Sequence, residues 1–537
     1  MRWILPLLIS IWLSAGLSCN YTAPDPPNII IILADDLGFA DLGCTGSSIP
    51  TPNLDQLATD GVLIPHFYTA ARCCPSRAAL LTGFYPHEVG MGDMVEGRLW
   101  RDSSFLPAYQ GWLDKTIPSL AEQLANQGYQ TFLSGKWHLG NAREHWPDQY
   151  GFQRHFAMIH GADNYFGSAP WISKDQFLAY SLDGQDYQPD TGFYLTDLIT
   201  EYAQEFIRTG PADQPFFLYL SYTAPHWPLQ APPADIRLFA DQYCHGWDLE
   251  RKAIFNRQLQ LGLFADTLDL PASWENQQRP AHTPEWGTLT TDQQQLWADR
   301  MAIYAAQVYG LDRAIGHLLT FLKAQDQLDN SLIFFLSDNG ATDAAIYAAT
   351  HWIADRSGEL GSVASFDSYG SRWAEVSNTP YRQFKKFTTE GGVIAPLIVH
   401  WPAAYLAGRT LNGVGHLIDI VPTCLALNGL PIDQFPGQSL LTAISSDSPL
   451  PQRTLFWEHE GNWAVRDGDW KLVYLRDTYR GGNGQPSLYN LQTDPFERYD
   501  QAIRHPKLVD SLHQLYHNWA HKTGVLPFDS LILAHPL

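Results

Sequence analysis

Residues 28–38 read NIIIILADDLG, an unbroken apolar run that ends in two aspartates and a glycine. An unbroken run, in contrast to an alternating one, is typical of a strand whose two faces are both covered, as in a parallel sheet. Comparable runs recur at FFLYLS (216–221), LIFFLS (332–337) and PLIV (396–399), with helical patterns between them. We therefore expect an α/β fold with a large, mainly parallel sheet sandwiched by helices.

The pattern of the sequence changes near residue 454. Residues 455–476, LFWEHEGNWAVRDGDWKLVYLR, are typical of an antiparallel hairpin with Asp467-Gly468 at a turn, and 505–522 read as a closing helix. We expect a main α/β domain at 28–453 and a small α+β subdomain with a short antiparallel sheet at 454–537. The polar stretch 241–298 has the character of an insertion over one face of the main domain.

The composition excludes two broad classes of protein. With 537 residues, of which 45% are apolar and 13% aromatic, the chain has ample material for a packed core and is not disordered. Its net charge of −22 disfavours nucleic acid as a partner, because that binding relies on Lys and Arg to neutralise phosphates. A small anionic substrate stays compatible with this charge, since a local cluster of cations can reverse the field inside one cleft.

The first 18 residues, MRWILPLLISIWLSAGLS, predict a secretory signal peptide, because an early arginine and a short apolar run precede small residues. Cys19 follows at once, where a bacterial lipoprotein carries its lipid, although Gly16 and Leu17 match that pattern poorly. No later run is long enough for a membrane span. We expect an exported protein that is periplasmic, held at the cell envelope or secreted, with a lipid at Cys19 as its route to a membrane.

The spacing of the cysteines is not that of a disulfide scaffold or of a zinc site. They lie far apart and without a C-x-x-C pair, so most are expected to be buried thiols. Zinc proteolysis is also disfavoured, because neither His87-Glu88 nor His459-Glu460 has the second histidine of H-E-x-x-H. The adjacent pair Cys73-Cys74 is the exception that needs a reason. The full set is Cys19, Cys44, Cys73, Cys74, Cys244 and Cys424.

Polar residues follow the predicted strands where each strand ends, which is where ligands bind in parallel α/β sheets. One such residue is ordinary turn chemistry, but the feature recurs at several strand ends. Four of these residues offer only oxygen ligands, a set suited to one hard cation, and we favour calcium over magnesium because calcium tolerates irregular geometry. The oxygen donors are Asp35, Asp36, Asp338 and Asn339, and the other strand-end residues are Lys136, His138 and His226.

The segment CCPSRAALLTG (73–83) supplies the reason for the paired thiols. C-x-P-x-R followed by L-T-G resembles the signature of the type I sulfatases, a family within the alkaline phosphatase superfamily. The resemblance implies that a maturation enzyme oxidises Cys73 to formylglycine in the exported, unfolded chain, while Cys74 occupies a variable position. Phe84 departs from the pattern, because many members carry Arg or Lys after L-T-G, where it aids recognition of the cysteine in some of them.

The resemblance covers residues 28 to about 525 and is nearest to bacterial arylsulfatases. GKWHLG (135–140), TAPHWP (223–228) and SDNG (337–340) match motifs of the family's site. Residues 369–392, YGSRWAEVSNTPYRQFKKFTTEGG, resemble the segment that carries a substrate lysine in bacterial arylsulfatases. Alignment through KKFTTEGG assigns that role to Lys385 rather than Lys386.

The resemblance implies an alkaline phosphatase-like fold and hydrolysis of aryl or carbohydrate sulfate monoesters to an alcohol or phenol plus sulfate. One hydroxyl of hydrated formylglycine would attack sulfur, and the second would expel sulfate as the aldehyde re-forms. The modified Cys73 would contact the metal beside its oxygen ligands. The implied roles are orientation of the diol by Arg77, sulfate binding by Lys136 and Lys385, protonation of the leaving group by His226 and proton removal during release by His138.

Two other functions remain open at this stage. One is a phosphonate or phosphate ester hydrolase of the same superfamily, since some of those enzymes also use formylglycine. The other is a non-catalytic protein that binds sulfated glycans while Cys73 stays a thiol. The expected partners are a sulfated small molecule or sugar and the formylglycine-generating enzyme, and the sequence does not distinguish aryl from sugar sulfates.

Overall fold

The computed structural model describes residues 26–95, 106–167, 180–190, 192–273, 284–346, 358–404, 408–446, 448–476 and 484–534. The expected signal peptide and Cys19 lie outside the described residues. Within these segments, no helix combines the length and the apolar character that crossing a bilayer requires.

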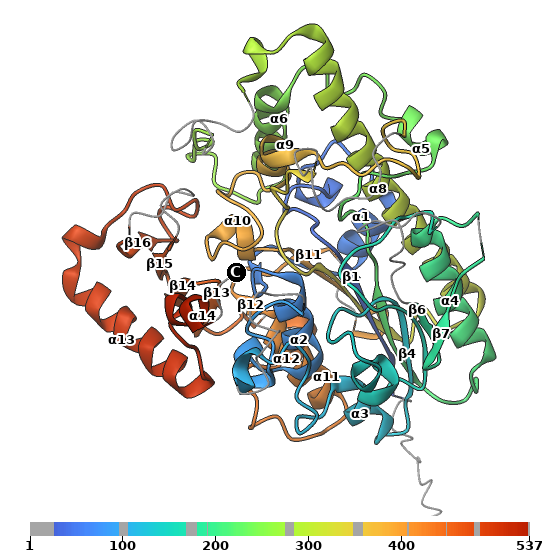
Figure 1. Cartoon of the computed structure of the whole chain (residues 1–537). Helices are drawn as coiled ribbons and strands as arrows, with labels where there is room; N and C mark the ends of the chain where they lie inside the picture. The colour runs from blue at the N-terminus through green and yellow to red at the C-terminus, as the bar shows by residue number, and fades with distance from the viewer. Residues whose placement is uncertain are drawn as a thin grey trace, which may run out of the picture.

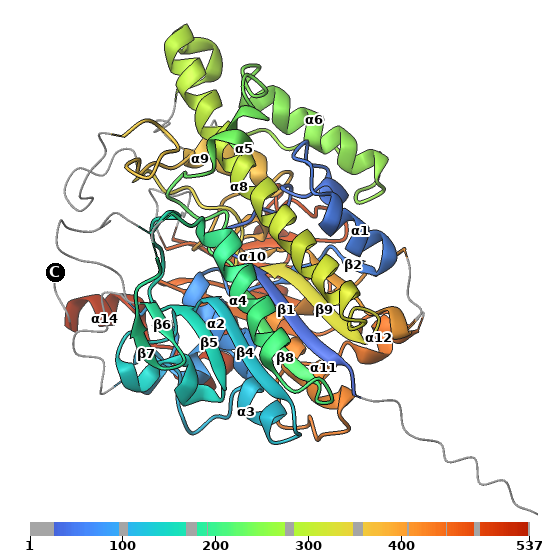
Figure 2. The ribbon, with the colours of Figure 1, turned by 90° about the vertical axis from the view of Figure 1, so that its right-hand side faces the viewer.

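A ten-stranded sheet forms the centre of the main domain (Figures 1 and 2). Its strand order is β11-β2-β10-β9-β1-β8-β4-β5-β6-β7. The strands between β9 and β5 are mutually parallel, whereas β10 is antiparallel to both of its neighbours and β6 and β7 form an antiparallel edge. The expected mainly parallel α/β sheet is thus confirmed. The strands are β1 (Asn28–Ala34), β2 (Val62–Ile64), β4 (Gln130–Lys136), β5 (Arg154–Met158), β6 (Tyr180–Leu182), β7 (Gln185–Tyr187), β8 (Phe216–Ser221), β9 (Ser331–Ser337), β10 (Leu397–His400) and β11 (Arg409–Thr410).

Helices cover both faces of this sheet. In Figures 1 and 2, α4 (Leu195–Thr209) and α8 (Thr291–Ala324) lie over one face, and α2 (Cys73–Thr82) and α11 (Ile420–Leu427) lie over the other. The central strands β1, β4, β8 and β9 are buried along their whole length, which explains the unbroken apolar runs in three of them. Burial of those runs is the main contribution to the stability of the domain.

Shorter elements complete the main domain. Outside the large sheet, β3 and β12 pair with each other as parallel strands. Helix α6, which lies within residues 241–298, packs against α9. These elements are β3 (Phe67–Tyr68), β12 (Gly415–His416), α1 (Pro52–Asp60), α3 (Leu120–Ala125), α5 (Pro233–Arg237), α6 (Trp247–Gln260), α9 (Gly370–Ser377), α10 (Glu390–Val393) and α12 (Leu441–Ser445).

A four-stranded antiparallel sheet follows the main domain, as expected for the C-terminal subdomain (Figure 1). It consists of β13 (Thr454–His459), β14 (Asn462–Asp467), β15 (Trp470–Tyr474) and β16 (Ser487–Asn490), with α13 (Pro506–Thr523) and α14 (Phe528–Ala534) after it. The predicted turn at Asp467-Gly468 joins β14 to β15, and Gly468 has a φ of 56°, which favours glycine.

The subdomain is fixed to the main domain by buried polar contacts. Lys471 Nζ lies 2.5 Å from Glu390 Oε1 and 3.1 Å from Glu497 Oε1, and Arg382 Nε lies 3.1 Å from Glu497 Oε2. Trp457 also donates a hydrogen bond from its indole N–H to the backbone carbonyl of Thr69 at 2.8 Å. These contacts bring the β13–β14 turn toward the start of α2.

Candidate active site

The carboxyl ends of β1, β4, β8 and β9 bring the expected polar residues together. In the parallel pair β1–β9, Ala34 lies opposite Ser337, so the aspartates that follow each strand leave the sheet at the same level. Lys136 is the last residue of β4, and His138 and His226 follow β4 and β8. Asp36 and His138 both have positive φ, at 62° and 56°, a conformation uncommon outside glycine that concentrates at functional sites.

The acidic residues form one buried group. The backbone N–H of Asp36 donates to Asp338 Oδ1 at 3.2 Å, and Asn339 Nδ2 donates to Asp36 Oδ1 at 2.6 Å. All of these side chains are at most 1% exposed, together with Asp35. Burial raises the pKa of Asp338 to about 7, with Asp35 adding to the rise and Arg77 opposing it. The group therefore holds more negative charge than its apolar surroundings tolerate without cations.

Two lysines supply part of that positive charge. Lys136 Nζ lies 2.5 Å from Asp35 Oδ2, and Lys385 Nζ lies 2.6 Å from Asp36 Oδ1. Burial by itself would lower the pKa of Lys385, but Asp36 raises it above its ordinary value. The structure thus places the Lys385 ammonium against Asp36, and its raised pKa keeps this group charged at neutral pH.

Arg77 ties three strand ends together from α2. Its guanidinium donates to Asp338 Oδ2 at 2.9 Å and to Ser221 Oγ at 2.5 Å, and also to the backbone carbonyl of Lys136 at 3.1 Å. Arg77 is fully buried and lies four residues after Cys73, so both side chains project from the same side of the helix. Arg77 thereby fixes the start of α2 relative to the acidic group.

Cys73 is the first residue of α2. The free backbone N–H groups at the start of a helix stabilise a nearby negative charge, such as that of a thiolate. A hydrogen bond from Cys74 lowers the pKa of the Cys73 thiol well below its ordinary value, and the charges of Lys385 and Lys136 add to this effect against the cost of burial. Cys73, Cys74 and His138 each place a nitrogen or sulfur atom within 4.8 Å of the others. The structure therefore brings the predicted nucleophile and the predicted bases and cations into one cluster.

His226 closes the cluster on the side of β8. Its Nε2 lies 3.4 Å from Asp36 Oδ2, and its Nδ1 contacts the backbone carbonyl of Trp227 at 2.7 Å. Burial lowers the pKa of His226 to about 3, with Asp36 opposing the shift and Lys385 and Lys136 adding to it. The imidazole is neutral at neutral pH in this arrangement, and an anion bound between it and the lysines would raise its pKa toward that of a proton donor.

The acidic group fits a bound hard cation. Three buried oxygen atoms have no hydrogen-bond partner within the described part of the chain, although their side chains are enclosed by protein: Asp35 Oδ1, Asp36 Oδ2 and Asn339 Oδ1. Buried acceptors without partners are costly, and carboxylate and amide oxygens are the donors that calcium and magnesium prefer. Asp35, Asp36 and His226 also each place a possible ligand atom within 4.8 Å of the other two.

Sequence reasoning missed several residues at the edge of this site. Ser221 accepts a hydrogen bond from Arg77, and the one feature of the sequence that could have identified it is its place as the last residue of a predicted strand. Met94 reaches the nucleophile, with its sulfur 4.0 Å from Cys73 Sγ, and the sequence around it carries no motif. His459 and Glu460 lie close to Arg72, which directly precedes Cys73, and they had been considered only as an incomplete zinc motif.

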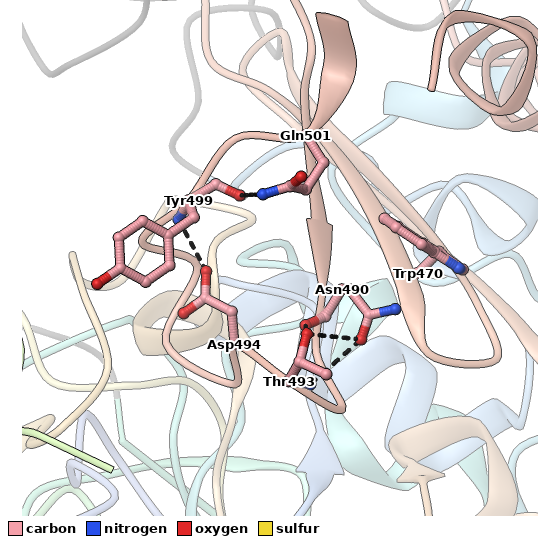
Figure 3. Close-up of a pocket in the computed structure, with 6 residues that line it drawn as sticks. All are labelled: Trp470, Asn490, Thr493, Asp494, Tyr499 and Gln501. Atoms are coloured by element: carbon pink, nitrogen blue, oxygen red, sulfur yellow. Dashed lines mark hydrogen bonds between the residues drawn. The ribbon is translucent and has the colours of Figure 1, made fainter. Parts of the chain in front are cut away.

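A shallow pocket of about 240 Å³ lies apart from this cluster, on the C-terminal subdomain (Figure 3). Figure 3 shows Trp470 and Tyr499 on opposite sides of Asn490 and Thr493, which hydrogen-bond to each other. Its polar groups are largely engaged in local turns, and none of the predicted site residues lines it.

Several known proteins are similar to this chain in sequence and in fold. A family profile described as Sulfatase matches residues 27–430. The chain is 34% identical to the arylsulfatase of Klebsiella aerogenes, over 77% of this chain and 88% of that protein. It is 32% identical to an uncharacterised sulfatase of Schizosaccharomyces pombe, over 93% and 94% of the two chains. Human N-acetylgalactosamine-6-sulfatase is 29% identical over 92% of this chain and 85% of that protein.

The solved structure of Ps i-CgsB in complex with k-i-k-neocarrahexaose has a TM-score of 0.66 at 25% identity, and the match covers 92% of this chain and 93% of that one. The agreement extends beyond the main domain, since it includes most of both chains. Together with the profile match and the arylsulfatase homologue, it leads to one conclusion: this chain is a hydrolase that belongs to the sulfatase family, within the alkaline phosphatase superfamily.

Proposed function

We propose that this chain hydrolyses sulfate monoesters through a formylglycine formed from Cys73. The observation that carries the proposal is the position of Cys73 at the start of α2, in one cluster with Lys136, Lys385 and His138 and beside the oxygen-rich acidic group. The modification supplies a geminal diol, of which one hydroxyl attacks sulfur and the other allows sulfate to leave as the aldehyde re-forms. A serine at this position would leave a sulfate ester as resistant as the substrate.

The charged and titratable side chains around Cys73 would bind the sulfate and transfer the protons. Lys136 and Lys385 would bind the sulfuryl oxygens and stabilise the negative charge that grows on them. His226 would protonate the leaving oxygen, and His138 would take the proton from the second hydroxyl. Arg77 would orient the diol. We assign one calcium ion to Asp35, Asp36, Asp338, Asn339 and the modified Cys73, where it would polarise a sulfate oxygen and favour ionisation of the diol.

The substrate class in this proposal includes both aryl and carbohydrate sulfates. The arylsulfatase and N-acetylgalactosamine-6-sulfatase relatives support this range, and Ps i-CgsB was solved with a carbohydrate bound. We also propose that residues 1–18 direct export and that a formylglycine-generating enzyme modifies Cys73 during it. A periplasmic, envelope-anchored or secreted location would then follow, with Cys19 as the site of any lipid.

The decisive experiment combines peptide mass spectrometry with an activity assay. The protein is expressed with a formylglycine-generating enzyme and export, and the peptide that contains Cys73 and Cys74 is analysed. We expect an aldehyde at Cys73 with Cys74 intact, and hydrolysis of 4-nitrophenyl sulfate that is lost in Cys73→Ala and retained in Cys74→Ala. An unmodified thiol, or faster hydrolysis of the matching aryl phosphodiester than of the sulfate, would contradict the proposal.

A further inference from the structure

A second polar cluster lies where the two parts of the chain meet. Asp93 comes from the main domain, His459 is the last residue of β13, and Glu460 follows it in the turn to β14. Each places a ligand atom within 4.8 Å of the other two. Arg72 joins them from the residue before α2, with its Nη1 3.3 Å from Glu460 Oε1. None of these residues has a role in the reaction proposed above.

The cluster borders the proposed nucleophile. Met94 connects the two, since its sulfur lies 4.0 Å from Cys73 Sγ and its backbone N–H donates to Asp93 Oδ1 at 2.8 Å. The charge of a Cys73 thiolate also acts on Arg72 and on His459. The cluster is therefore a wall beside the reacting group, on the side of the C-terminal subdomain.

The solvent exposure of the side chains decreases from one side of this cluster to the other. The Glu460 side chain is 37% exposed and Arg72 15%, whereas Asp93 is 7% and His459 0% exposed. Among the residues that the structure describes, neither ring nitrogen of His459 has a hydrogen-bond partner. Leaving a buried donor or acceptor unpaired is costly, so this imidazole offers a hydrogen-bonding site to a bound ligand.

The charges restrict what that ligand is. Two carboxylates face the guanidinium of Arg72, and the charge of Lys386 also acts on His459. Burial lowers the pKa of His459 to about 3, so the imidazole adds no positive charge at neutral pH. A second sulfate or a uronate placed beside Asp93 and Glu460 would be repelled by their carboxylates, and a bare aromatic ring would leave the polar atoms of the cluster unpaired. A metal ion is disfavoured by the guanidinium that already neutralises Glu460.

Hydroxyl groups satisfy all of these constraints. A hydroxyl donates to a carboxylate while it accepts from, or donates to, a neutral imidazole, and it carries no charge. Resting on the sulfatase function proposed above, we propose that Asp93, His459 and Glu460 form a subsite that binds hydroxyls of the leaving group. The preferred substrate is then a neutral, hydroxyl-rich sugar that bears a single sulfate, in preference to an aryl sulfate or a polysulfated sugar.

The test compares two kinds of substrate in the same variants. The substrates are 4-nitrophenyl sulfate, the 6-sulfates of glucose, galactose, N-acetylglucosamine and N-acetylgalactosamine, and glucosamine 2-N,6-O-disulfate. The variants are His459→Phe, which keeps the volume, and Asp93→Asn, with the more exposed Glu460→Gln as the version least able to disturb folding. His400→Phe is the matched control, because His400 is also a buried histidine, 7% exposed. It ends β10 opposite Ile333, near the start of β9, and so lies at the end of the sheet away from the carboxyl ends of the parallel strands.

Aldehyde content at residue 73 is measured for each variant and rates are expressed per aldehyde, because Arg72 adjoins the modified residue. We expect kcat/KM for the best neutral sugar monosulfate to fall about 5–100-fold in His459→Phe and Asp93→Asn, the range that the loss of one hydrogen bond to a neutral or charged group would give. For the aryl sulfate we expect a change below about threefold, and no change for either substrate in His400→Phe.

Three results would overturn the subsite while leaving the sulfatase function intact. The first is an equal loss on sugar and aryl sulfates, or no loss on either. The second is a wild-type preference for the disulfated sugar, or hydrolysis of the aryl sulfate alone. The third is a second equivalent of bound metal that His459→Phe loses, which would make the cluster a cation site. Failure to hydrolyse any sulfate ester, with an aldehyde present, would reject both the subsite and the proposed function.

Discussion

Lys385 Nζ lies 2.6 Å from Asp36 Oδ1, in a pair that is almost entirely buried. Lys386, its neighbour, follows with a φ of 81° and donates its backbone N–H to Ala71 at 2.7 Å. Two adjacent lysines therefore serve different ends: one side chain enters the acidic group, while the backbone of the other anchors the segment beside α2.

This difference predicts unequal effects of removing each charge. Lys385→Met should lower kcat for 4-nitrophenyl sulfate about 10²–10³-fold, because a donor aimed at developing negative charge is lost. Lys386→Met should lower it less than about tenfold. Steady-state kinetics on both variants, with aldehyde content and melting temperature measured in parallel, checks the prediction. Equal losses, at equal aldehyde content, would mean that the sulfate-binding role is not specific to Lys385.

The unpartnered oxygens of Asp35, Asp36 and Asn339 predict dependence on a divalent cation. Removing the ion with a chelator should abolish hydrolysis and lower the melting temperature, and calcium should restore both more fully than magnesium. At a free concentration of 100 Kd the ion would stabilise the fold by about 2.7 kcal/mol. Thermal unfolding in chelator, calcium or magnesium measures this directly. A melting temperature indifferent to all three would contradict a cation at this position.

The strand ends of the site were predictable because the information is local. The apolar runs of β1 and β9 identify buried strands. Because such strands run parallel, Asp35 and Asp338 are expected at the same end of the sheet, whatever the structure of the rest of the chain. The antiparallel direction of β10 was not predictable, since a short apolar run carries no sign of its direction. The subsite beside Cys73 was hidden for another reason, because Arg72 and Glu460 are 388 residues apart and no periodicity links them.

Gly161 predicts a way to disturb His138 alone. A Cβ at Gly161 would lie 2.4 Å from Cε1 and 2.6 Å from Nε2 of the imidazole, so Gly161→Ala must displace that ring. We expect slower turnover with little change in KM, since the proposed role of His138 is in release of sulfate and not in binding. A burst of product followed by slow turnover would place the defect in release.

Gly310→Ala is the matched control for that substitution. A Cβ at Gly310, within α8, would meet its nearest neighbour at 3.7 Å, which is ordinary van der Waals contact. This variant should keep full turnover and gain slight stability, because alanine favours the helix by about 1 kcal/mol. If Gly161→Ala were as active as Gly310→Ala, His138 would not have the proposed role.

The contact between the main domain and the C-terminal subdomain predicts a pH dependence of stability. Burial alone would raise the pKa of Glu497, but Lys471 and Arg382 lower it below its ordinary value of 4.5. A carboxyl group whose pKa is lower in the folded chain stabilises the fold above the pKa of the unfolded chain, and this contribution is lost as the pH falls through the folded value.

Glu497→Gln should therefore be less stable than the wild type at pH 7 by about 3–5 kcal/mol, since it leaves Lys471 and Arg382 buried with reduced compensation. The difference should begin to shrink near pH 4.5 and should disappear as the pH falls through the lower folded pKa, where the carboxyl group of the folded wild type is protonated too. Denaturant unfolding of both proteins between pH 3 and 8 measures it. Arg476→Gln, whose ion pair with Asp529 is largely exposed, should cost under about 1 kcal/mol at every pH. A constant difference for Glu497→Gln across this range would show that its charge does not hold the subdomain against the site.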